Sequence, residues 1–224
     1  NPTRDKVQAW EAQQLANATG GAVALENGGA SQEIVGGKPA LDGRWPFMVG
    51  LLSANISNNF SAQFCGGTLI DAEHVLTAAH CVVGDSASSM QVLVGTRSLA
   101  EGGRRVNVER VTTHPKFRSV GGGWDVAVLR LTTPVNDIEP VAYMRTKAEE
   151  STYAPPGTLT TATGWGSRNA SGGNFPEELY KVRVPIVSRA QCNGSDSYDG
   201  DISSTMICAG LLGEGGKDTC GGDS

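Results

Sequence analysis

From residue 34 onward, the chain is a series of short runs rich in β-branched and apolar residues, each bounded by turn residues. Few stretches show helical periodicity, and glycine, at 30 of 224 residues, is nearly twice as frequent as the average of ~7%. This pattern predicts an all-β chain. The expected strands are Phe47–Leu52, Gln63–Ile70, Gln91–Val94, Arg105–Thr113, Val126–Leu131, Leu159–Trp165, Tyr180–Val187 and Met206–Ala209.

The expected strands fall into two groups, separated by a looser segment at residues 145–157 that contains Pro155 and Pro156. We expect two antiparallel β-barrels, the first within residues 34–144 and the second, incomplete in this chain, within 158–224. Residues 1–33 contain no cysteine and differ in composition from the rest, so we expect a leader or propeptide there. A short helix with Val7, Trp10 and Leu15 on one face, or disorder, are the alternatives for its conformation.

Charge and hydropathy exclude several classes of partner. No uninterrupted apolar stretch approaches the ~18 residues that a membrane-spanning helix requires. The net charge of −5 makes the chain mildly acidic, and the charged residues are nowhere clustered along the sequence. We therefore expect neither a nucleic acid nor a membrane as a partner.

The five cysteines indicate in which cellular compartment the protein folds. Cys65 and Cys81 are sixteen residues apart, as are Cys192 and Cys208, and neither spacing suits a zinc knuckle. Two disulfides are the better interpretation, and closing a loop of ~15 residues contributes ~3 kcal/mol in the loop-entropy model. Because disulfides persist in oxidising compartments, we expect a secreted, extracellular protein.

Nucleophilic catalysis by a hydroxyl group requires a serine, a histidine that accepts its proton and a carboxylate that orients the histidine. Three histidines are available. His80 follows an apolar run and lies beside Cys81, so a disulfide would hold it rigidly. His74, in a strand or turn, and His114, at the end of another strand before Pro115, fit a structural or exposed role better.

Five motifs occur along the chain in an order that one family shares: Ile34-Val35-Gly36-Gly37, Cys65-Gly66-Gly67-Thr68-Leu69-Ile70, Thr77-Ala78-Ala79-His80-Cys81, Asp125-Val126-Ala127-Val128-Leu129-Arg130-Leu131 and Asp218-Thr219-Cys220-Gly221-Gly222-Asp223-Ser224. From Ile34 to Ser224 the chain thus resembles the chymotrypsin/trypsin family of serine endopeptidases. The resemblance implies two six-stranded antiparallel β-barrels of the chymotrypsin-like type, with the active site in the cleft between them.

The resemblance also implies the catalytic roles. His80 would be the general base, Asp125 would orient it, and Ser224 would attack the scissile carbonyl to form an acyl-enzyme. The backbone N–H groups of Gly222 and Ser224 would form the oxyanion hole. The alternative role for Asp125 is that of an ordinary cap.

Asp218 precedes Ser224 by six residues, where the family places the residue at the base of its primary specificity pocket. A carboxylate there would select substrates with Arg or Lys before the cleaved bond. The alternative is a surface carboxylate beside Lys217.

The resemblance also implies activation by proteolysis. Cleavage between Glu33 and Ile34 would free an α-amino group that pairs with Asp223, so the chain with residues 1–33 would be a zymogen. Glu33 departs from the usual Arg or Lys at this junction. We therefore expect an activating protease that selects Glu33 or Ile34 rather than self-activation.

We expect no cofactor and no bound metal. The family's calcium loop would correspond to residues 95–105, where Glu101 is the single carboxylate, whereas calcium takes six to eight oxygen ligands.

A non-catalytic family member that acts as a binding or regulatory module is the main alternative to an enzyme, because fold alone does not fix activity. Family members continue past the nucleophile, and Cys220 would by family pattern pair with a cysteine beyond Ser224. On that pattern we expect the chain as written to be incomplete or inactive by itself.

Overall fold

The structure is a computed structural model that describes residues 37–40, 44–168 and 174–212. Strands dominate these ranges, and the fold is all-β, as predicted. None of the helices within them has the length and apolar character required to cross a membrane.

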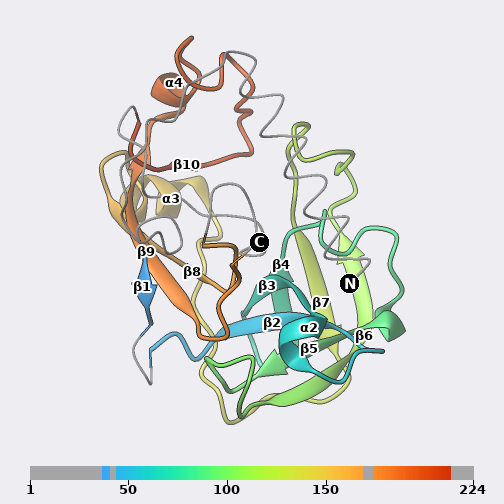
Figure 1. The fold of residues 1–224 in the computed structure, drawn as a ribbon. Coiled ribbons are helices and arrows are strands. Elements are labelled where there is room, and N and C mark those ends of the chain that lie inside the picture. Colours follow the sequence, from blue (N-terminus) through green and yellow to red (C-terminus); the bar gives the residue numbers. More distant parts are fainter. Residues whose placement is uncertain (1–36, 41–43, 169–173, 213–224) are drawn as a thin grey trace.

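Six strands close into an antiparallel barrel in the order β2-β3-β4-β7-β6-β5 (Figure 1). They are β2 (Met48–Ser53), β3 (Gln63–Leu69), β4 (His74–Thr77), β5 (Met90–Val94), β6 (Arg104–Thr113) and β7 (Ala127–Leu131). In β7 the residues alternate between buried and half-buried, because every second side chain enters the barrel. β2 is buried along its whole length, since Val49 and Leu51 face the barrel core while Met48 and Leu52 belong to a second cluster.

A four-stranded sheet lies beside the barrel (Figure 1). β9 (Tyr180–Val187) pairs antiparallel with β8 (Leu159–Gly164), β1 (Lys38–Pro39) and β10 (Cys208–Ala209). Val182 and Val184 of β9 pack on one face of the sheet with Tyr180. β1 is the strand nearest the N-terminus in the described ranges, yet it pairs with this second sheet instead of the barrel.

An apolar cluster joins the barrel to the second sheet. It contains Leu52 and Leu93 from the barrel, Trp165 and Leu179 from the segments around β8 and β9, and Leu99 between β5 and β6. The Arg97 carbonyl accepts hydrogen bonds from the Trp165 indole at 3.0 Å and from the Leu179 N–H at 2.7 Å. Packing and backbone hydrogen bonds therefore fix how the two units sit together.

The helical elements are short. They are α2 (Asn59–Ala62), the 3₁₀ turn η1 (Ala87–Ser89), α3 (Lys147–Tyr153) and α4 (Arg189–Cys192). α3 lies inside the segment 145–157 that was expected to be an irregular linker. Thr146 and Glu149 form a capping box at its N-terminus, which satisfies the first free N–H groups of the helix.

Each of the eight predicted runs contains a strand, and the predicted bounds coincide with the observed ones or differ by one or two residues. β1 was not predicted as a strand, because two residues are too short to show alternation. His74, expected in a strand or turn, is the first residue of β4. The expectations for residues 1–33 lie outside the described residues.

Candidate active site

The pairing of β4 with β7 brings two candidate residues together. Thr77 at the end of β4 lies opposite Ala127 at the start of β7. His80 comes three residues after Thr77, and Asp125 comes two residues before Ala127. Because the strands are antiparallel, both residues leave the sheet at the same end.

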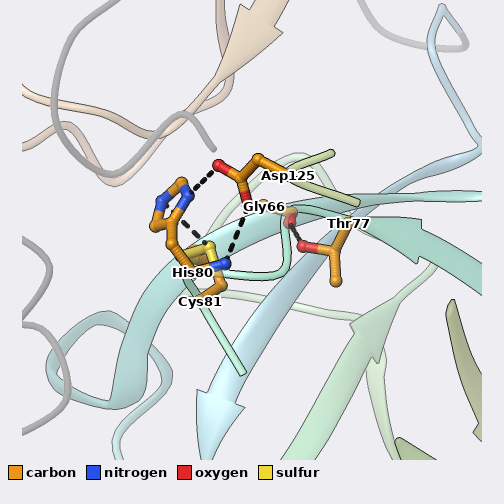
Figure 2. Close-up of a disulfide and its surroundings, with 6 residues drawn as sticks. Gly66, Thr77, His80, Cys81 and Asp125 are labelled. Atoms are coloured by element: carbon orange, nitrogen blue, oxygen red, sulfur yellow. Dashed lines mark hydrogen bonds and ion pairs between the residues drawn. A yellow bond between two sulfur atoms is a disulfide. The ribbon is translucent and has the colours of Figure 1, made fainter. Parts of the chain in front are cut away.

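Asp125 contacts His80 at two points (Figure 2). Its Oδ2 lies 2.6 Å from His80 Nδ1, and its Oδ1 accepts a hydrogen bond from the His80 backbone N–H at 2.8 Å. Both side chains are largely shielded from solvent, with 11% of His80 and 18% of Asp125 exposed. In the neutral ring, an Nδ1–H donated to the carboxylate leaves Nε2 as the basic nitrogen.

The environment keeps Asp125 ionised. Burial by itself would raise the pKa of this carboxyl, but hydrogen bonds from the His80 side chain and from the backbone of His80 and Ala79, together with the charge of His80, outweigh burial and lower the pKa. The carboxylate can therefore orient His80 and stabilise its protonated form at neutral pH.

The backbone around His80 is held from the barrel side (Figure 2). Cys81 forms a disulfide with Cys65 of β3, and the Thr77 hydroxyl donates to the Gly66 carbonyl at 2.8 Å. His80 and the two sulfurs lie within 4.8 Å of one another. Since both sulfurs are used in the disulfide, they offer no thiolate to a metal ion.

The other two histidines lie in different surroundings. His74 Nδ1 contacts both carboxylate oxygens of Asp71 at 2.9 Å on the exposed side of the barrel. His114 stacks on Trp124, with ring centroids 4.6 Å apart and an interplanar angle of 16°. Lys116 covers the Trp124 ring as well, at 4.6 Å from its centroid.

The loop before Asp125 is anchored to the second unit, a feature that the sequence analysis missed. Gly123 and Trp124 both have left-handed backbone conformations, with φ of 73° and 60°. The Trp124 N–H donates to the Thr205 hydroxyl at 3.3 Å. The glycine run at residues 121–123 was the sequence signal for this tight loop.

Several candidates lie outside the described residues: Glu33, Ile34, Asp218, Cys220, Gly222, Asp223 and Ser224. Within the described ranges, Cys192 and Cys208 form the second predicted disulfide.

A closed six-stranded antiparallel barrel beside a second sheet defines a protein of the chymotrypsin-like all-β class. Comparison with known proteins gives the family. The trypsin family model matches residues 34–224. The chain belongs to the trypsin family and is a serine endopeptidase.

Three relatives illustrate the similarity. Trypsin II-P29 of Gallus gallus is 37% identical over 213 residues, which cover 92% of this chain and 77% of that protein. Trypsin of Saccharopolyspora erythraea is 38% identical over 192 residues, 85% of this chain and 79% of its own length. Trypsin Blo t 3 of Blomia tropicalis is 35% identical over 192 residues, 85% of this chain and 70% of that protein.

Proposed function

We propose that this protein is a secreted zymogen of a trypsin-like endopeptidase that hydrolyses peptide bonds after Arg or Lys with a triad of Ser224, His80 and Asp125. The observation that carries the triad is the two-point contact between Asp125 and His80, at 2.6 and 2.8 Å. The two disulfides support secretion, because such bonds persist outside the reducing cytosol.

In this proposal, Nε2 of His80 accepts the proton of the Ser224 hydroxyl as the serine oxygen attacks the substrate carbonyl. The backbone N–H groups of Gly222 and Ser224 stabilise the oxyanion of the tetrahedral intermediate. His80 then donates its proton to the leaving amine, which produces the acyl-enzyme. Water releases the acyl group by the same steps in reverse, with His80 again as the base.

A fluorophosphonate probe tests the triad, because it reacts only with an activated serine. The complete, Ile34-processed protein should be labelled at Ser224, and both Ser224→Ala and His80→Ala should abolish labelling. His74→Ala is the matched control and should leave labelling unchanged, since His74 contacts Asp71 and lies opposite Arg130, at the other end of the β4–β7 pairing from Thr77 and Ala127. Failure of the processed protein to react would favour the non-catalytic binding module.

Asp218 is proposed as the residue that selects basic substrates. Asp218→Ser should lower kcat/KM for an Arg substrate by about thirtyfold or more, because leaving a buried partner charge unpaired costs ~2–5 kcal/mol. Labelling by the fluorophosphonate should persist. Asp201→Ser, at an exposed carboxylate, is the control, and an unchanged Arg preference in Asp218→Ser would contradict the assignment.

Activation is proposed to require cleavage between Glu33 and Ile34, after which the new α-amino group pairs with Asp223. The proform should be incubated with proteases that select Glu on the acyl side and with proteases that select Ile on the leaving side. The active species should begin at Ile34. An active species with another N-terminus would contradict this site.

A further inference from the structure

A pocket of ≈660 Å³ lies on the second sheet, away from His80 and Asp125. β1 runs along β9 at this place (Figure 1). We call it the basic pocket, and its polar and aromatic lining consists of Lys38, Arg44, Trp45, Thr161, Lys181 and Arg183.

The strand register explains why the charged side chains meet. Lys181 and Arg183 of β9 alternate with Val182 and Val184, which are buried in a cluster with Tyr180. Val182 also contributes to the lining of the basic pocket. In the antiparallel pairs, Lys38 lies directly opposite Lys181, and Thr161 lies directly opposite Arg183. Since opposed residues share a face, three strands present these side chains on one side of the sheet.

The charge of the basic pocket is unbalanced. Its described lining residues include four cations and no carboxylate, although the whole chain has a net charge of −5. Within the described ranges, the ion pairs are formed by other basic residues. Directly opposed like charges such as Lys38 and Lys181 destabilise a sheet. A bound anion would remove this repulsion.

Trp45 adds two unfavourable features to the wall of the basic pocket. Its backbone is left-handed, with φ of 66°, which is an outlier for a bulky residue. Its indole Nε1 is buried and has no hydrogen-bond acceptor among the described residues. The Trp45 ring itself packs edge-on against Phe47, and strained backbone conformations cluster at ligand-binding sites.

We propose that the basic pocket binds a tetrahedral oxyanion, a sulfate or phosphate group, as the free ion or as a substituent on a sugar chain. Arg44 and Arg183 offer guanidinium groups, which match two oxygens of such an anion at once. Lys38 and Lys181 supply compact charges, and Thr161 offers a hydroxyl donor. The site is separate from the proposed triad, so its occupancy does not depend on catalysis.

Calorimetric titration of the full chain tests the proposal with two probes, sodium sulfate and a sulfated disaccharide, against sodium chloride at equal ionic strength. Whichever probe binds identifies the form in which the anion is recognised. In Lys181→Gln/Arg183→Gln, binding should weaken at least about tenfold, the factor expected from losing one charge-assisted contact. Arg110→Gln/Lys147→Gln is the matched control, since it removes one Arg and one Lys that are exposed elsewhere on the chain.

Thermal unfolding gives a second readout that does not require a tight complex. Without added anion, Lys181→Gln should raise the midpoint of unfolding, because it relieves the repulsion from Lys38. With the anion that binds, the midpoint of the unsubstituted protein should rise more than that of Lys181→Gln.

Three results would overturn the proposal. The first is that neither probe binds the unsubstituted protein beyond the effect of sodium chloride. The second is that the matched control loses as much affinity as the pocket variant. The third is a tri-glutamate peptide that binds more tightly than both probes, which would assign the basic pocket to carboxylates.

Discussion

Asp125 contacts His80 through both of its carboxylate oxygens, so replacing it by asparagine keeps the shape and removes the charge. An asparagine amide can donate to Nδ1 and thereby favour the wrong histidine tautomer. In related triads this change lowers kcat by about 10⁴, and we expect a similar loss for Asp125→Asn in steady-state kinetics of the processed protein.

Asp71→Asn is the matched control for that prediction. Asp71 also contacts a histidine Nδ1, at 2.9 Å, but its side chain is 56% exposed. Exposed ion pairs contribute little, so kcat should stay unchanged within about twofold. Equal losses of kcat in Asp125→Asn and Asp71→Asn would show that the loss does not come specifically from the contact between Asp125 and His80.

The lowered pKa of Asp125 has a consequence for acid stability. A carboxyl group whose pKa is depressed by folding contributes stability above its unfolded-state value of about 3.9 and loses that contribution as the pH falls through the folded-state value. The free energy of unfolding should therefore differ between Ser224→Ala and Ser224→Ala/Asp125→Asn at neutral pH. This difference should shrink as the pH falls below about 4, as measured by denaturant titration, and a difference that persists or grows in acid would contradict the sign.

Contacts with the second unit hold the loop before Asp125 in place and so help to position Asp125. A Cβ added at Gly123 would meet the Ser203 hydroxyl at 2.8 Å and would overlap the Thr205 hydroxyl, and the φ of 73° is itself unfavourable for alanine. Gly123→Ala should therefore reduce both stability and kcat. At Gly157, with φ of 90°, an added Cβ meets nothing within 4 Å.

Gly157→Ala is thus the matched control, since it adds the backbone strain without the steric overlap. It should cost roughly 1–2 kcal/mol of unfolding free energy and leave kcat unchanged. Gly123→Ala should cost more in denaturant unfolding and should also slow turnover of a peptide substrate. If Gly123→Ala and Gly157→Ala changed the unfolding free energy and kcat by equal amounts, the contact with Thr205 would be unimportant.

Local pattern predicted those elements whose signal lies within a few residues. β7 shows the alternation of Ala127, Leu129 and Leu131 directly, because a ladder requires a period of two. The capping box of Thr146 and Glu149 was present in the sequence but was overlooked beside Pro155 and Pro156.

Other features depend on partners far along the chain. The conformation of Trp124 depends on Thr205, and β1 becomes a strand only because β9 pairs with it. The closeness of His80 and Asp125, separated by 45 residues, was implied by resemblance to a family and follows physically only from the register of β4 and β7.

At the scale of the whole molecule, the apolar cluster around Leu99 joins the barrel to the second sheet. Leu99 is 1% exposed and packs with Leu52, Trp165 and Leu179. Leu99→Ala should lower the free energy of unfolding by ~2–5 kcal/mol, as other buried leucine truncations do. Denaturant titration measures this change.

Val83→Ala provides the comparison, because Val83 is 53% exposed. It should change the free energy of unfolding by less than about 0.5 kcal/mol. A loss below ~1 kcal/mol for Leu99→Ala would mean that the cluster does not hold the two units together.

The pairing of β1 with β9 has a consequence for the order of folding. Lys38 and Pro39 are translated before the barrel, but their partners Lys181 and Tyr180 are translated after it. Contacts this distant in sequence close late, since chain entropy opposes them and N-terminal units fold first during synthesis. The barrel, which carries both His80 and Asp125, can therefore close before β1 pairs with β9. The basic pocket would therefore bind an anion only in chains in which both units have finished folding.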